Sequence, residues 1–239
     1  MTVIGRQGET GPKMTSQTWT EETDPDCIDD ASAAAMLDGA PWRRLAVIGD
    51  STAIGLGAPY RGYRRLTSFA RMADTLAMAV GPINYMNLGT PWATSRKVVE
   101  GQKDLMVAFK PDLVMISCGG NDLMVDTPDY AAIAANLTEL FEAGKSVGAQ
   151  TMTMTLADAF PDESMVRFRS SLARLNELVR KIAAEHDAIL IDLWHHSVGH
   201  RPDVMSNDRI HFNMSGHAVL AAEAVKALAA HIPQRANTV

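Results

Sequence analysis

From Trp42 onward, short apolar runs alternate with longer amphipathic stretches. The short runs predict five strands. They are residues 45–49 (LAVIG), 83–89 (INYMNLG), 112–120 (DLVMISCGG), 151–157 (TMTMTLA) and 188–194 (AILIDLW). The second run alternates between polar and apolar residues, which is typical of a strand at the edge of a sheet.

The longer stretches predict helices, because their apolar residues recur at intervals of three and four. One helical face holds Phe168, Leu172, Leu175, Val179 and Ile182, and another holds Ile133, Leu137, Leu140, Phe141 and Val147. Further helices are expected over residues 65–80, 92–108 and 215–231. Strands that alternate with helices in this way imply an α/β fold, in which a parallel sheet carries helices on both faces.

The first forty residues differ in composition from the rest. Residues 1–30 are rich in Thr, Glu, Asp, Gly and Pro and have little to bury, so we expect a flexible acidic tail. The segment DDASAAAMLDG predicts a short helix, with Asp30 or Ser32 as its N-cap and Gly39 as its stop. The predicted organisation is a tail over residues 1–40 and one domain over residues 41–235.

Charge and cysteine content narrow the functional classes. The net charge is −6, from 22 basic and 28 acidic residues, and no basic stripe is present, so nucleic-acid binding is not expected. The two cysteines, Cys27 and Cys118, are too few for a disulfide framework or a four-thiolate metal site. The histidines of WHHSVGH have no cluster of carboxylates or cysteines beside them, so no metal site is predicted.

The sequence also bears on location. Its N-terminus lacks the charged region and apolar core of a signal peptide. No apolar run approaches the roughly 18 residues that a membrane helix needs. We therefore expect a cytoplasmic protein without a membrane span.

A serine, a glycine and an asparagine lie at the ends of three of the predicted strands, and an aspartate and a histidine precede the last helix. They are Ser51 in the motif GDS, Gly89 in NLGT, Asn121 in GGND, and Asp208 and His211 in DRIH. Ligands of parallel α/β sheets bind outside the carboxyl ends of the strands. We therefore expect these residues to meet there, although they are far apart along the chain.

These residue types are the ones that acyl-transfer chemistry uses. A serine hydroxyl becomes a nucleophile when a base takes its proton, and a neutral imidazole does so near pH 7. A carboxylate then fixes the tautomer of the imidazole. Ser51, His211 and Asp208 can supply these three groups. The backbone N–H groups of Ser51 and Gly89, with the side-chain amide of Asn121, are predicted to form an oxyanion hole.

In this order along the chain, the four motifs resemble those of the SGNH hydrolase family, also called GDSL-like lipases and esterases. The resemblance covers residues 42–230 and implies a flavodoxin-like three-layer α/β/α sandwich with a five-stranded parallel sheet. It also implies Ser51 as the nucleophile, Gly89 and Asn121 as oxyanion donors, and His211 as the base with Asp208 behind it. Thr52 follows the serine where the family often has Leu or Ile.

The predicted reaction is cleavage of small acyl esters, short-chain or acetyl, on a small-molecule or glycan substrate, through an acyl-enzyme. Acyl transfer to another alcohol, thioester cleavage and lysophospholipid cleavage would use the same site. A flavodoxin-like binding module is the alternative from another class, but the residues after Ser51 lack the hydroxyls and glycines that cradle phosphate. No cofactor is expected, and the sequence assigns neither substrate-binding residues nor an oligomeric state.

Two further residues near these motifs are interpreted as structural. His217 lies in the first turn of the last helix, where packing or capping is favoured over a role as the base. Asp50 is expected to fix the turn that presents Ser51.

Overall fold

The computed structural model describes residues 19–160 and 165–232. Its centre is a five-stranded parallel sheet in the order β2-β1-β3-β4-β5. The strands are β1 (Arg44–Gly49), β2 (Asn84–Asn87), β3 (Leu113–Ser117), β4 (Gln150–Met154) and β5 (Ile189–Ile191). The five predicted strands are confirmed, and β2 lies at an edge as expected. Four of them end earlier than predicted, because the last residues of those apolar runs leave the sheet as loops.

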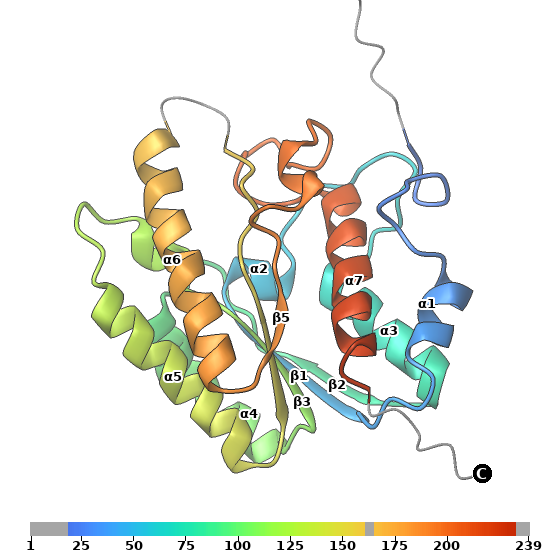
Figure 1. Ribbon diagram of the computed structural model, residues 1–239, viewed down its shortest axis with the longest axis horizontal. Helices are drawn as coiled ribbons and strands as arrows, with labels where there is room; N and C mark the ends of the chain where they lie inside the picture. The colour runs from blue at the N-terminus through green and yellow to red at the C-terminus, as the bar shows by residue number, and fades with distance from the viewer. Residues whose placement is uncertain (1–18, 161–164, 233–239) are drawn as a thin grey trace, which may run out of the picture.

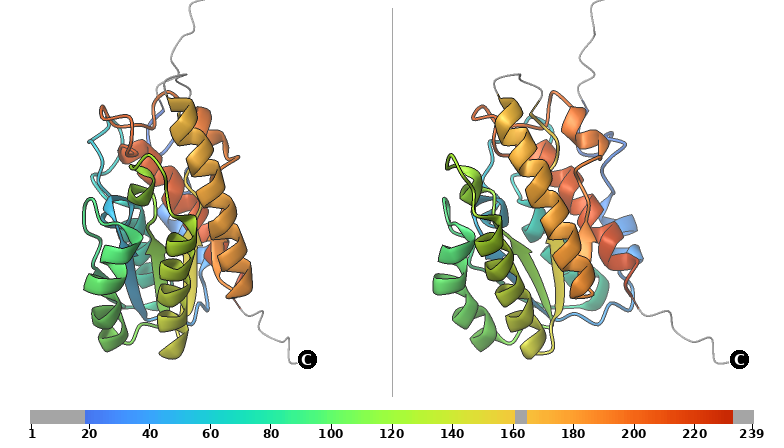
Figure 2. Two further views of the ribbon diagram at one scale, coloured as in Figure 1. Left: turned by 90° about the vertical axis from the view of Figure 1, so that its left-hand side faces the viewer. Right: turned by 60° about the vertical axis from the view of Figure 1, so that its left-hand side comes forward.

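Helices cover both faces of this sheet (Figures 1 and 2). Helices α1 (Asp30–Met36), α3 (Ser68–Val80) and α7 (Met214–Ala229) lie on one face. Helices α4 (Ser95–Phe109), α5 (Tyr130–Ser146) and α6 (Val166–Glu185) lie on the other. Three short helices follow strands: α2 (Ser51–Ile54) and the 3-10 helices η1 (Asn121–Leu123) and η3 (Ser197–His200). The three-layer α/β/α fold is confirmed.

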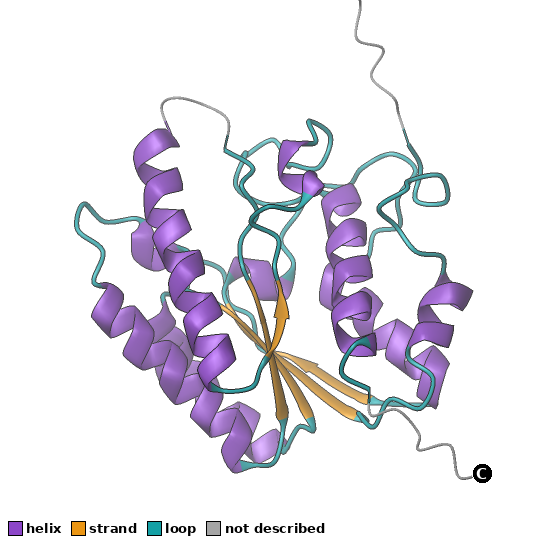
Figure 3. Cartoon of the chain, viewed as in Figure 1, coloured by secondary structure: helices purple, strands orange, loops and turns teal. Residues whose placement is uncertain are grey.

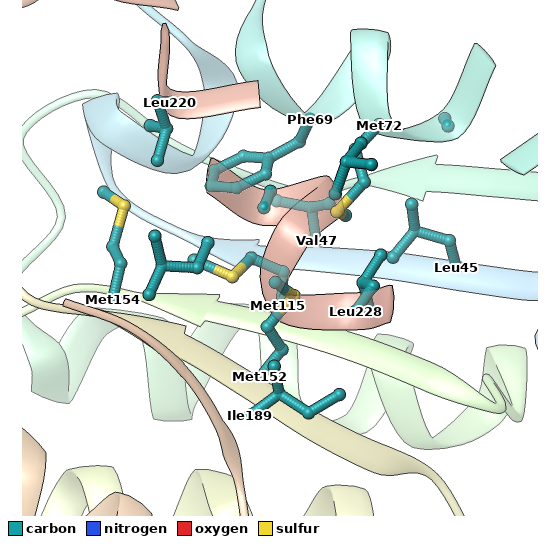
Figure 4. Close-up of a cluster of buried hydrophobic side chains, with 14 of the residues drawn as sticks. Leu45, Val47, Phe69, Met72, Met115, Met152, Met154, Ile189, Leu220 and Leu228 are labelled. Atoms are coloured by element: carbon teal, nitrogen blue, oxygen red, sulfur yellow. The ribbon is translucent and has the colours of Figure 1, made fainter. Parts of the chain in front are cut away.

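The two cores follow from the alternation of side chains along each strand. In β1, Leu45 and Val47 pack on the side of α3 and α7, whereas Ala46 and Ile48 pack on the side of α4 and α5. Figure 4 shows the first of these cores, in which methionines such as Met115 fill the space between the sheet and the helices. Complete burial of each large side chain stabilises the fold by roughly 1.5–3 kcal/mol.

The N-terminal residues that the structure describes lie against the rest of the chain. Ala33 in α1 and Leu37, the first residue after this helix, belong to the same core as Leu45 and Val47 of β1. The N-cap of α1 is Asp29, whose Oδ1 accepts the N–H of Ser32 at 2.9 Å. The predicted caps, Asp30 and Ser32, are therefore wrong by one to three positions. Residues 1–18 of the predicted tail lie outside the described residues, and the division at residue 40 stays a prediction.

The loops that follow the strands gather at one end of the sheet, together with α2 (Figure 3). This end is where the candidate residues of the sequence lie. None of the helices in the described ranges is long and apolar enough to cross a membrane.

Candidate active site

The turn between β1 and α2 places Ser51 at the carboxyl end of β1, which lies beside the central strand β3. Gly49 has a φ of 143°, and a Cβ there would lie 1.8 Å from the carbonyl oxygen of Ser117 in β3, so only glycine fits. Asp50 caps α2, because its Oδ1 accepts the N–H of Thr52 at 2.8 Å and the Thr52 hydroxyl at 2.7 Å. Ser51 is the first residue of α2 and is 8% exposed.

Asp208 and His211 lie at the tip of a hairpin over residues 204–213. Its two sides are joined by a hydrogen bond from the N–H of Ser206 to the carbonyl of His211, at 2.8 Å. The Oδ1 of Asp208 accepts the N–H groups of Ile210 and His211 at 2.9 and 3.1 Å, which turns the chain back on itself. The acid is thereby brought onto the histidine ring three residues later.

The three predicted catalytic residues meet in one line of hydrogen bonds. The Oδ2 of Asp208 lies 2.8 Å from Nδ1 of His211, and Nε2 of His211 lies 2.8 Å from the Oγ of Ser51. Partial burial opposes ionisation of Asp208, but the hydrogen bonds from the ring and from two backbone amides outweigh it and lower the pKa of the carboxyl. The carboxylate is therefore charged beside the ring, and this arrangement orients Nε2 toward the hydroxyl.

Asn121 lies at the start of η1 and lines one cavity together with Ser51 and His211. Its Nδ2 donates to the carbonyl of Ala93 at 3.0 Å. Because the amide carries two N–H groups, the second can meet a substrate oxygen. Asp122 holds this loop in place, since its carboxylate accepts the backbone N–H and the hydroxyl of Ser95 at 2.8 and 2.7 Å.

Gly89, the other predicted oxyanion donor, has a different role. Its N–H donates to Oδ1 of Asn87 at 2.9 Å, so the group already has a partner. A Cβ at Gly89 would lie 2.4 Å from the backbone nitrogen of Ile54. The glycine therefore lets the loop after β2 pack closely against α2. As an oxyanion donor, Gly89 is not supported by this geometry.

Two buried ionisable residues border the site. His217 is 3% exposed, and its Nδ1 and Nε2 contact the Ser68 hydroxyl at 2.7 Å and the carbonyl of Leu56 at 3.2 Å. Burial lowers its pKa to about 4, so the ring is neutral near pH 7, and both nitrogens have structural partners. Burial raises the pKa of Asp50 to about 6 against the opposing hydrogen bonds from Thr52.

An apolar cavity of about 90 Å³ opens beside Ser51, His211 and Asn121. Its other lining residues are mostly apolar: Leu56, Met124, Met154, Leu156, Ala157, Ala159, Phe160, Phe168, Leu172, Leu193, Met205, Ile210, Phe212 and Leu220. Some of these residues, such as Leu172, Leu193 and Leu220, are buried, whereas Leu56, Met124 and Ile210 are exposed. Sequence reasoning assigned Phe168 and Leu172 only to the packed face of a helix. Their place in α6, near the residues after β4, is the signal that could have found them.

Among the described residues, no group of three or more His, Cys, Asp or Glu is arranged to hold a metal ion. The groups gathered at the site are a serine, a histidine, an aspartate and an amide, beside an apolar cavity.

The fold and the site together place the chain in a class of α/β proteins. In this class a serine, a histidine and an aspartate meet beside the carboxyl ends of the strands of a parallel sheet. The model of the GDSL-like lipase/acylhydrolase family matches residues 47–219, and the chain belongs to this family. The resemblance seen in the four motifs is confirmed, and with it the assignment of the chain as a hydrolase.

Solved structures share the fold at low sequence identity. A lipase/acylhydrolase from Enterococcus faecalis is 23% identical with a TM-score of 0.64, over 81% of this chain and 100% of that chain. An acetyl xylan esterase from Geobacillus stearothermophilus is 22% identical with a TM-score of 0.63, over 80% and 96%. The protein TesA is 23% identical with a TM-score of 0.63, over 78% and 98%. No curated protein sequence matches this chain.

Proposed function

We propose that the protein hydrolyses short-chain acyl esters through an acyl-enzyme on Ser51. The observation that carries the proposal is the line of two 2.8 Å contacts from Asp208 through His211 to the Ser51 hydroxyl. In the first step His211 Nε2 takes the hydroxyl proton while Oγ bonds to the ester carbonyl carbon. The same proton then passes to the leaving alcohol oxygen as the ester C–O bond breaks.

In the second step a water molecule replaces the alcohol. His211 takes a proton from the water, the oxygen bonds to the acyl carbon, and the proton returns to Oγ as the acyl-enzyme bond breaks. Both steps pass through an oxyanion. The second N–H of the Asn121 amide and the N–H of Ser51, in the first turn of α2, are the donors that we assign to it.

The apolar cavity supports an acyl group as its occupant. An apolar cavity of about 150 Å³ can hold benzene, so about 90 Å³ has room for roughly three or four carbon atoms. Most of its lining residues offer carbon atoms rather than hydrogen-bond donors. We therefore assign a short apolar acyl chain, close to butanoyl in size, to this cavity. The acetyl xylan esterase of the same fold is consistent with a small acyl group.

The nucleophile and base are tested with p-nitrophenyl butyrate and a fluorophosphonate label. Ser51→Ala is expected to lose the label and to reduce kcat by at least about a thousandfold, and His211→Ala to reduce kcat similarly. Ser146→Ala and His231→Ala, which change exposed residues away from the site, serve as matched controls. Wild-type turnover in Ser51→Ala would exclude the proposed nucleophile.

The acyl assignment is tested with p-nitrophenyl esters from two to ten carbons. We expect kcat/KM to be highest near four carbons and to fall beyond about six, because longer chains exceed the cavity. Leu172→Ala, which enlarges it, should move the optimum to longer chains. Leu175→Ala removes an equally buried leucine from the same helix but not from the cavity wall, and should leave the optimum unchanged.

A further inference from the structure

One arginine joins the N-terminal segment to the hairpin that carries Asp208 and His211. The Arg201 side chain is 9% exposed and bonds three aspartates. Its Nη1 donates to Asp24 Oδ1 and Asp26 Oδ2 at 2.8 and 2.9 Å. Its Nη2 donates to Asp24 Oδ2 and Asp203 Oδ2 at 2.8 and 2.9 Å, and Nε donates to Asp203 Oδ1 at 3.1 Å. Every N–H of the guanidinium is therefore used. We call these four residues the Arg201 clamp.

The N-terminal half of the clamp is itself firmly held. The Asp24 side chain is completely buried and also accepts the Tyr63 hydroxyl at 2.6 Å. Burial opposes its charge, but the bonds from Arg201 and Tyr63 outweigh burial and lower the pKa of Asp24. The ring of Trp19 lies 4.6 Å from the Arg201 guanidinium carbon. Because a buried charge needs its partner, removing Arg201 would leave the Asp24 carboxylate uncompensated.

The other half of the clamp is the base of the catalytic hairpin. The backbone carbonyl of Asp203 accepts Nδ2 of Asn213 at 2.7 Å and the Ser215 hydroxyl at 2.9 Å. Asn213 in turn donates its N–H to Val204, which closes the hairpin two residues after His211. Figure 1 shows the N-terminal segment in blue beside the start of α7, where this base lies.

We propose that the Arg201 clamp positions the catalytic histidine, so that residues 19–26 act as a strap on the hairpin that holds His211 against Ser51. Arg201 and Asp24 are positioning residues, since they reach the reacting atoms only through the hairpin. The inference rests on the proposed function. The strap precedes the residues that match the family, 47–219, so it is a feature of this chain beyond the matched region.

The experiment compares Arg201→Met, Arg201→Lys and Asp24→Asn in the full chain with the control Arg64→Met. Arg64 binds the same N-terminal segment through Glu21 and Asp30, and within residues 19–160 and 165–232 its side chain makes no hydrogen bond to the hairpin. Turnover of p-nitrophenyl butyrate is measured per labelled serine, and amide hydrogen exchange is measured over residues 203–213. Circular dichroism reports whether each variant is folded.

We expect kcat per active site to fall at least tenfold in Arg201→Met, with an intermediate loss in Arg201→Lys, because an ammonium has three donors instead of five. KM should change less than about threefold, because most of the residues that line the cavity lie outside the hairpin, which contributes Met205, Ile210, His211 and Phe212. Hydrogen exchange of the hairpin should rise in Arg201→Met and Asp24→Asn, but not in Arg64→Met.

The inference is overturned if Arg201→Met keeps the wild-type kcat and hairpin exchange, or if Arg64→Met changes both equally. A wild-type protein that neither turns over esters nor labels at Ser51 would instead refute the proposed function. In that case the exchange data still decide whether the clamp holds the hairpin: unchanged exchange in Arg201→Met overturns the clamp as well.

Discussion

Asp50 holds the turn before Ser51 in place, but burial of its carboxyl group lowers the stability of the fold at neutral pH. Its carboxyl is 3% exposed, yet it must remain where it caps α2 and fixes the turn before Ser51. Burial raises its pKa to about 6, well above the ordinary value of about 4 for aspartate. Between these two pH values the folded protein keeps a proton that the unfolded chain has lost.

This difference predicts a pH dependence of stability. The contribution of Asp50 is fully present below about pH 4 and is lost as the pH rises to about 6, because the unfolded chain binds fewer protons there. A shift of about two pH units corresponds to roughly 3 kcal/mol. Asp50→Asn keeps the acceptor for Thr52 and removes the titration. From pH 4 to pH 6.5 the variant should therefore gain up to about 3 kcal/mol in free energy of unfolding relative to wild type.

Urea unfolding at the two pH values measures this difference. The buried His217, which lines the same cavity, also makes the stability of the fold depend on pH, because its lowered pKa destabilises the fold toward low pH. This contribution is present in both proteins and cancels in the comparison. A constant difference between variant and wild type from pH 4 to pH 6.5 would show that Asp50 does not titrate in this range.

At the residue scale, the sequence predicts contacts that are local and misses those set by distant parts of the chain. The spacing of Asp208 and His211 is enough to predict their pairing, because an aspartate can turn the chain back within three residues. A local contact can also be missed: the N–H of Gly89 donates to Asn87, two residues earlier in the same NLGT motif, and the motif does not show that this N–H has a partner. Asp24, a partner of Arg201, lies 177 residues away along the chain. The composition of its segment predicts a tail, so the sequence does not indicate this contact.

At the scale of elements, the close packing of the loop after β2 against α2 fixes the position of Ser51. A Cβ at Gly89 would lie 2.4 Å from the Ile54 nitrogen, so one of the two segments must move. We expect Gly89→Ala to lower the free energy of unfolding by about 1–3 kcal/mol and to reduce kcat, because α2 carries the proposed nucleophile. Urea unfolding and ester turnover measure the two effects.

The matched control is Gly101→Ala in α4, where a Cβ meets no atom within 4 Å. Alanine is the better helix former, so this variant should be as stable as wild type or more stable by up to about 1 kcal/mol. If Gly89→Ala and Gly101→Ala had the same free energy of unfolding and the same kcat, the packing of the loop against α2 would not depend on Gly89.

Four of the five strands are predicted better at their starts than at their ends, whereas the helices expected over residues 65–80 and 92–108 are predicted better at their ends. Strand β3 begins within one residue of its predicted start, since Asp112 follows a helix and a proline. It ends at Ser117, although the apolar and small residues continue to Gly120. The hydrophobic pattern indicates only which residues are buried, and residues 118–120 are buried or half-buried although they lie in a loop. The pattern therefore cannot show where the strand ends.

At the scale of the whole molecule, the N-terminal part of the described chain shares the core of the sheet. Leu37 is fully buried in the cluster that includes Leu45 and Val47, although it precedes the residues that match the family. Leu37→Ala should therefore lower the global free energy of unfolding by about 2–5 kcal/mol. Met36→Ala, which changes a neighbouring exposed side chain, should cost much less.

Chemical denaturation followed by tryptophan fluorescence and by circular dichroism measures this cost. Coincident transitions in the two signals would indicate that the segment unfolds together with the sheet. A Leu37→Ala variant as stable as wild type would mean that the segment contributes nothing to the common core.

The shape of the cavity beside Ser51 bears on which half of an ester the enzyme discriminates. Its lining includes buried side chains such as Leu172, Leu193 and Leu220 and the exposed side chains of Leu56, Met124 and Ile210. Under the proposed function, an acyl chain that fills the cavity would leave the alcohol moiety on the side of the exposed residues. Selectivity should therefore fall on the acid portion, while alcohols as different as ethanol, glycerol and a sugar unit of a long polysaccharide are tolerated alike.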